Sequence, residues 1–78
     1  MPSAPPPPDW VAAQRRAVGM RIRELRLHAN LTQEQVWIRS GVDRASVVRI
    51  EQGQQSPTLD TLIRLAAAIG VPLRELVE

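Results

Sequence analysis

The chain has 78 residues, a net charge of +2 and no cysteine, which predicts one small domain with a modest core. The lack of cysteine excludes a disulfide framework and a thiolate metal site. No apolar run approaches the roughly 20 residues of a membrane-spanning helix, and residues 1–10 lack the basic-then-apolar pattern of a secretion signal, so we expect a cytoplasmic protein.

The charge is unevenly distributed along the chain. Residues 1–50 hold eight arginines and four acidic residues, whereas residues 51–78 hold two arginines and four acidic residues. A basic half suggests a polyanionic partner, although it does not prove one.

Residues 1–8 are rich in proline and are expected to form an extended or disordered tail. From residue 9 to residue 78 the pattern is helical. Asp9 is placed to cap a first helix that ends near residue 29, and Asn30 suits a left-handed stop after it. Apolar residues recur along this helix at helical spacing: Val11, Val18, Ile22, Leu25 and Ala29.

A second helix is predicted from Thr32 to about residue 40. Thr32 and Gln35 have the spacing of a capping box, in which each side chain bonds the other residue's backbone N–H. Leu31 and Val36 flank the cap as a hydrophobic staple, which sets the angle at which the chain enters the helix. Gly41 ends the helix.

Three more helices follow. Asp43 caps the third, with Val42 and Val47 as its staple, and Gly53 stops it. The fourth starts at residues 57–58 and ends at Gly70. Its apolar stripe is Leu59, Leu62, Leu65, Ala66 and Ile69, and a short fifth helix from Pro72 carries Leu73, Leu76 and Val77. No segment alternates as a strand does, so the pattern predicts an all-α domain of five short helices.

The two sides of the third helix differ in chemistry. At 100° per residue, Val47, Ile50 and Glu51 fall on one side, with Ser46 at its edge. The opposite side has no acidic residue, and this pattern alone fits a binding surface and an ordinary solvated surface equally well. In order around the helix, that side carries Arg44, Val48, Gln52, Ala45 and Arg49.

Two capped helices joined by a short turn through Gly41 have the construction of a helix-turn-helix, whose second helix enters the DNA major groove. Over residues 18–77 the chain resembles the Cro/C1-type (XRE) helix-turn-helix family. The motifs that carry the resemblance are RIRELR, LTQEQ, SGVDRASVVRIEQG, SPTLDTL and LAAAIGVPLRELV. The resemblance implies a five-helix, lambda-repressor-like DNA-binding domain at 9–78, with the helix-turn-helix at 32–52.

The resemblance also implies roles for individual residues. Those expected to meet base edges are Arg44, Ala45, Val48 and Arg49, and Arg49 could instead reach a phosphate. Those expected to contact DNA phosphates are Gln33, Ser46, Gln54 and Gln55. Arg26 and Glu51 match a structural ion pair of the family.

Three features depart from the family pattern. Trp37 occupies a position where the family prefers a small residue, so we expect its ring to be partly exposed and turned off the contact between the second and third helices. Gln54 and Gln55 stand where relatives often carry basic residues. The first helix starts about eight residues early, which leaves residues 9–18 without an assigned role.

Other functions find less support. His28 is the only histidine, no acidic cluster has metal-ligand spacing, and no serine has an adjacent base, so we expect neither an enzyme nor a bound metal, cofactor or small molecule. The remaining alternative is a protein-interaction module on the same fold, such as an antitoxin or adaptor half. Exposed Trp10 and Ile38 would support that alternative.

We therefore expect a sequence-specific regulator of transcription that binds double-stranded DNA, as a small stand-alone repressor or controller. Relatives bind a palindromic operator as homodimers, and we expect the same here, with residues 9–18 contributing to the dimer interface. Such a protein would lie in the bacterial cytoplasm, associated with the nucleoid, and would not enter a membrane.

Overall fold

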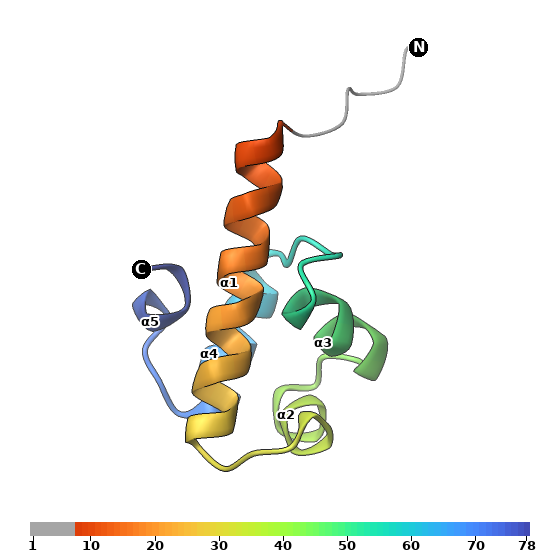
Figure 1. Ribbon diagram of the computed structural model, residues 1–78. Coiled ribbons are helices and arrows are strands. Elements are labelled where there is room, and N and C mark those ends of the chain that lie inside the picture. The colour runs from red at the N-terminus through yellow and green to blue at the C-terminus, as the bar shows by residue number, and fades with distance from the viewer. Residues whose placement is uncertain (1–7) are drawn as a thin grey trace.

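The computed structural model describes residues 8–78, which form five helices and no strand (Figure 1). The helices are α1 (Asp9–His28), α2 (Gln33–Ser40), α3 (Arg44–Glu51), α4 (Leu59–Ile69) and α5 (Arg74–Val77). The predicted all-α class and five-helix order are confirmed. The expected proline-rich tail, residues 1–8, lies outside the described residues except for Pro8.

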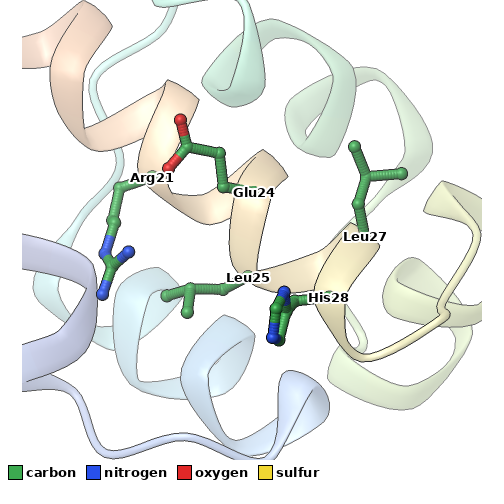
Figure 2. Close-up of a pocket in the computed structure, with 5 residues that line it drawn as sticks. All are labelled: Arg21, Glu24, Leu25, Leu27 and His28. Atoms are coloured by element: carbon green, nitrogen blue, oxygen red, sulfur yellow. The ribbon is translucent and has the colours of Figure 1, made fainter.

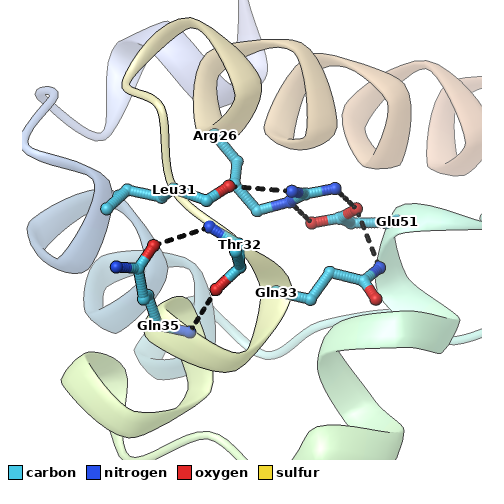
Figure 3. Close-up of polar contacts among 6 residues, drawn as sticks. All are labelled: Arg26, Leu31, Thr32, Gln33, Gln35 and Glu51. Atoms are coloured by element: carbon cyan, nitrogen blue, oxygen red, sulfur yellow. Dashed lines mark hydrogen bonds and ion pairs between the residues drawn. The ribbon is translucent and has the colours of Figure 1, made fainter.

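The helix ends follow the local signals closely. The capping box of α2 is present, with Gln35 N–H bonding Thr32 Oγ1 at 3.1 Å and Thr32 N–H bonding Gln35 Oε1 at 2.8 Å (Figure 3). Asp43 caps α3 through the Ser46 N–H at 3.0 Å. Asn30 adopts the predicted left-handed conformation after α1, with φ of 58°.

The predicted cap of α1 is wrong by one residue. Asp9 is the first helical residue, and Pro8 precedes it as the cap without a side-chain hydrogen bond. The Pro8 carbonyl accepts hydrogen bonds from the N–H groups of Val11 and Ala12 at 2.9 and 3.2 Å. Asp9 then places its carboxylate in the first turn, where the helix dipole favours a negative charge.

The core forms where the inner faces of all five helices meet. Figure 1 shows α1 running along the body, with α4 behind it and α2 with α3 to one side of it. Four of the predicted apolar positions lie outside this core: Val11, Ala29, Leu59 and Val77. Ala29 follows the last turn of α1, Leu59 is the exposed first residue of α4, and Val77 is exposed on α5. The buried apolar cluster comprises Ile22, Leu31, Val36, Val42, Val47, Ile50, Leu65, Ala66, Ile69 and Leu76.

An ion pair ties the last helix to the first. Arg21 in α1 donates from Nη2 to Glu75 Oε2 at 2.8 Å and from Nε to the Glu75 carbonyl at 3.0 Å. Both side chains are about 38% exposed, so water screens the attraction and the pair contributes little on its own. Leu76, the residue after Glu75, is buried, and its burial holds α5 in place more strongly than the exposed ion pair does.

Among residues 8–78, none of the helices has the length and apolar character needed to span a membrane.

Candidate nucleic-acid interface

The connection between α2 and α3 is a tight turn of three residues. Gly41 has φ of 74°, a conformation that costs glycine little because it has no Cβ. The Val42 N–H bonds Ser40 Oγ at 3.1 Å, and the Val42 side chain is buried. Asp43 then caps α3 directly, so the turn sets the angle between the two helices.

Helix α3 has one buried face and one exposed face, as predicted. Val47, Ile50 and Glu51 are buried, and Ser46 at their edge is half-buried. On the opposite face, Val48 is half-buried and the other four residues are exposed: Arg44, Ala45, Arg49 and Gln52. The exposed face is therefore basic, short and free of carboxylates.

A buried ion pair holds the C-terminal end of α3 against α1 (Figure 3). Arg26 donates from Nε to Glu51 Oε2 at 2.7 Å and from Nη2 to Glu51 Oε1 at 3.0 Å. Its Nη1 bonds the Leu31 carbonyl at 2.9 Å, between α1 and α2. Two parallel bonds fix the relative orientation of the partners as well as their distance. The pair therefore links α1, the start of α2 and α3.

Gln33 extends this network. As the first residue of α2, it donates from Nε2 to Glu51 Oε1 at 3.2 Å (Figure 3). Its side-chain amide is thus turned toward the ion pair in this structure. Its backbone N–H lies at the helix N-terminus, where free N–H groups favour an anion.

The loop after α3 is tied back to that helix. Gln55 donates from Nε2 to Ser46 Oγ at 3.0 Å, and the exposed Gln54 bonds the Arg49 carbonyl through its N–H at 2.8 Å.

Hydrogen bonds from the side chain and backbone of Ser46 lower the pKa of Asp43 below its usual value. The hydrogen bonds at the start of α3 thus favour the ionised form of the Asp43 carboxyl group.

Helix α1 also reaches this loop, a contact that the sequence analysis missed. Arg15 donates from Nε to the Gly53 carbonyl at 2.8 Å. The adjacent Arg16 packs so closely on Gly53 that a Cβ there would lie 2.5 Å from Arg16 Cγ. Gly53 also has φ of 73°, so both space and conformation favour glycine. The sequence signal was the unassigned segment 9–18, but nothing in it identifies a partner 38 residues away.

Trp37 differs in part from the expectation. Its ring is half-buried, as predicted, and packs against the edge of the core. It is not turned away from α3, however, because the Arg44 guanidinium carbon lies 5.6 Å from the ring centroid. The large side chain is accommodated by extending from α2 toward the first residue of α3.

Outside α3, the described surface includes a depression on α1. An open depression of about 670 Å³ lies along the C-terminal half of α1 (Figure 2). His28 in its lining is exposed, and within residues 8–78 no three His, Cys, Asp or Glu residues come together as metal ligands would. The lining of the depression is Arg21, Glu24, Leu25, Leu27 and His28.

Trp10 and Ile38 are exposed, as predicted.

A family model described as helix-turn-helix matches residues 22–76. The HTH-type transcriptional regulator y4dJ of Sinorhizobium fredii is 43% identical over 63 residues, which are 81% of this chain and 82% of that protein. The cryptic phage CTXphi transcriptional repressor RstR of Vibrio cholerae is 44% identical over 57 residues, covering 73% of this chain and 51% of the repressor.

Two solved structures are similar to this chain over most of its length. The restriction-modification controller protein C.AhdI from Aeromonas hydrophila superposes with a TM-score of 0.80 at 39% sequence identity, covering 82% of this chain and 97% of the controller. The hypothetical transcription factor NHTF from Neisseria has a TM-score of 0.80 at 25% identity, covering 97% of this chain and 85% of that protein.

Proposed function

Because the chain belongs to the XRE-type helix-turn-helix family of DNA-binding transcriptional regulators, we propose that it binds a palindromic operator as a homodimer, with α3 in the major groove of each half-site. The feature that carries this proposal is the exposed face of α3. A B-DNA major groove is about 12 Å wide and admits one α-helix. The α3 face is basic and free of acid, and the buried Arg26–Glu51 pair holds α3 against the domain.

Base contacts are assigned to the exposed face of α3. Arg44, at the first turn, and Arg49, further along the helix, are exposed and suited to guanine O6 and N7. Ala45 and Val48 between them have the size to meet thymine methyl groups. Because the N-terminal residues of a recognition helix contact base edges most directly, Arg44 and Ala45 should lie deepest.

Phosphate contacts are assigned to the ends of the neighbouring elements. Gln33 offers the N-terminus of α2, whereas Ser46, Gln54 and Gln55 lie on α3 and the loop after it. The bond between Gln55 and Ser46 holds that loop beside α3. None of these side chains is charged, so the arginines carry most of the electrostatic attraction and the salt dependence of binding should be moderate.

Dimerisation would compensate for the small size of the module. One domain of this length contacts only a short stretch of DNA, and a two-fold dimer doubles that stretch while matching an inverted repeat. Residues 9–18 of α1 are proposed to contribute to the interface, since Trp10 is 70% exposed on the long first helix. A dimer on chromosomal DNA would lie in the bacterial cytoplasm.

The regulatory role is proposed to be that of a repressor or controller. Among the relatives, RstR is described as a transcriptional repressor and C.AhdI as a restriction-modification controller. The chain spans about half of RstR but nearly all of C.AhdI. The comparison with the controller is therefore the more complete of the two, and it supports a controller role.

The test is selection of bound sites from a random pool of duplex DNA. The proposal expects enrichment of an inverted repeat whose half-sites are centred about one helical turn apart, or a multiple of that distance. Enrichment of a single, unrepeated site would contradict the dimer on a palindrome. The DNA-binding function itself would be contradicted if no site were enriched above the input pool and the protein showed no salt-dependent binding to random duplex.

A further inference from the structure

Arg44 has an aromatic neighbour that the proposed function does not use. We propose that Trp37 is a positioning residue for base readout, which holds the Arg44 guanidinium against its indole ring and presents it to the groove. This inference rests on the proposed function, because it assigns Arg44 to the DNA. It would also give a purpose to the bulky residue in a slot where the family prefers a small one.

The geometry is that of a cation–π contact. The guanidinium carbon of Arg44 lies 5.6 Å from the centre of the Trp37 ring, inside the roughly 6 Å limit for such contacts, and tryptophan is the strongest aromatic partner. The ring is itself anchored, because it is half-buried and packs against the core from α2. A fixed ring on one helix therefore restrains the first side chain of the next.

This arrangement leaves the hydrogen-bonding groups of Arg44 available. A guanidinium that packs its face on a ring keeps its N–H groups directed outward in its own plane, and these groups are the ones that bond guanine O6 and N7. Within residues 8–78 the two ion pairs involve Arg21 and Arg26, so no carboxylate competes for Arg44. A cation–π contact of this kind restrains the side chain without using its hydrogen-bond donors.

The physical benefit is a smaller loss of side-chain entropy on binding. A free, exposed arginine loses rotamer freedom when it locks onto a base, and a side chain already restrained loses less. Arg49 offers an internal comparison on the same helix. It is exposed, and the chain has only two aromatic residues, Trp10 and Trp37. Arg44 is the one arginine of residues 8–78 seen over an aromatic ring.

A double-mutant cycle on the full-length chain tests the proposal. Trp37→Leu retains apolar bulk but removes the ring, and Trp37→Phe retains a smaller ring. Each is combined with Arg44→Ala and, as the matched control, with Arg49→Ala. Binding to the selected operator, and to operators changed at the base pair that Arg44→Ala identifies, is measured by fluorescence anisotropy at one salt concentration. Circular dichroism at the temperature of the binding measurement checks that every variant is folded.

The proposal expects Trp37→Leu to weaken operator binding by up to about 12-fold, the cost of immobilising one flexible side chain, with an intermediate loss for Trp37→Phe. The loss should vanish when Arg44 is already alanine and persist when Arg49 is alanine. Discrimination at the Arg44 base pair should fall, and discrimination elsewhere should not. A purely structural tryptophan would weaken binding to all sequences alike and independently of Arg44.

Three results would overturn the inference, and the first two would do so without affecting the proposed function. In the first, the parent binds the operator and Arg44→Ala weakens that binding, but the fold-losses from the Trp37 and Arg44 substitutions are independent of each other. Trp37 then does not position Arg44, and the proposed function stands. If Trp37→Leu binds and discriminates as the parent does, the inference also fails alone. If the parent binds no duplex, or Arg44→Ala binds as the parent does, the assigned DNA face fails and the inference fails with it.

Discussion

Gly19 in α1 lies directly against the carbonyl of Ile50 in α3, so that a Cβ at position 19 would overlap the Ile50 oxygen and come within 3.0 Å of the Glu51 oxygen. The two helices thus meet backbone to backbone just where α3 carries its ion-paired glutamate. This contact sets how closely α3 lies against the domain. Only a residue without a side chain allows it.

Gly19→Ala should destabilise the domain. Helix propensity alone favours alanine over glycine by about 0.5–1 kcal/mol. Overpacking costs about 1–3 kcal/mol, and here the obstacle is backbone that cannot rotate aside, so the steric effect should exceed the propensity gain. Thermal denaturation followed by circular dichroism should show a lower midpoint. Ala17→Gly, an exposed change in the same helix, is the control and should cost only the propensity difference. A raised midpoint for Gly19→Ala would contradict the close contact.

Removing one partner of the Arg26–Glu51 pair should cost more than removing both. Glu51→Ala leaves the Arg26 guanidinium buried without a carboxylate, and breaking a buried pair in this way costs about 3–5 kcal/mol. The double variant Arg26→Met, Glu51→Leu should recover much of that loss, because apolar pairs of similar volume are tolerated. Urea denaturation measures both. A double variant less stable than Glu51→Ala would indicate that the hydrogen bonds to Leu31 and Gln33 matter more than the charges.

Arg44→Ala should weaken operator binding by about 1–3 kcal/mol and relax the preference at one base pair, as expected for loss of a bidentate guanine contact. Arg49→Ala should also weaken binding, with more of the loss shared by random duplex DNA. Arg74→Ala on α5 makes the same charge change away from α3 and serves as the control. Equal effects of all three substitutions on operator and random DNA would show that net charge, not a specific face, drives binding.

The Asp43 cap should make α3 sensitive to acid. Hydrogen bonds from the Ser46 side chain and backbone lower the pKa of Asp43 in the folded state, so its ionisation stabilises the fold above the unfolded-state pKa. That contribution is lost as the pH falls through the lowered folded-state pKa. The midpoint difference between the parent and Asp43→Asn should therefore be largest above about pH 5 and shrink toward pH 2. A constant difference across this range would mean that the charge of Asp43 adds nothing to its capping.

Trp10→Glu should weaken self-association if residues 9–18 contribute to the dimer interface, because it places a charge where a contact would bury the indole. Sedimentation velocity of the parent and of Trp10→Glu measures this. Ile63→Glu is the matched control, because Ile63 is also an exposed apolar residue but lies on α4 instead of α1. If Ile63→Glu dissociates the dimer and Trp10→Glu does not, α4 forms the interface. A parent that remains monomeric both free and on its operator would rule out the dimer.

The parts of the fold that sequence predicts well are those governed by short-range chemistry. Thr32 with Gln35, and Asp43 before α3, are each decided by hydrogen bonds within four residues, so their positions can be read directly. The α3 faces follow from helical periodicity. The exposure of Leu59 was not predicted, because periodicity does not tell where along a helix the neighbouring helices end.

The contacts that sequence did not predict join residues far apart in the chain. Arg15 meets Gly53 across 38 residues and Arg21 meets Glu75 across 54, and no local pattern encodes such pairs. Trp37 was correctly expected to need space, but its direction depends on where Arg44 lies. That relation emerges only when both helices are placed in three dimensions.

The most direct test of the DNA-binding face is the titration of ¹⁵N-labelled protein with the selected operator, followed by amide chemical shifts. If α3 reads the DNA, the largest changes should fall over residues 44–49, with further changes at Gln33 and at residues 53–55, and small changes on α4 and α5. Changes centred on α4, α5 or the depression along α1, with α3 unaffected, would contradict the assignment of α3 as the helix that reads DNA.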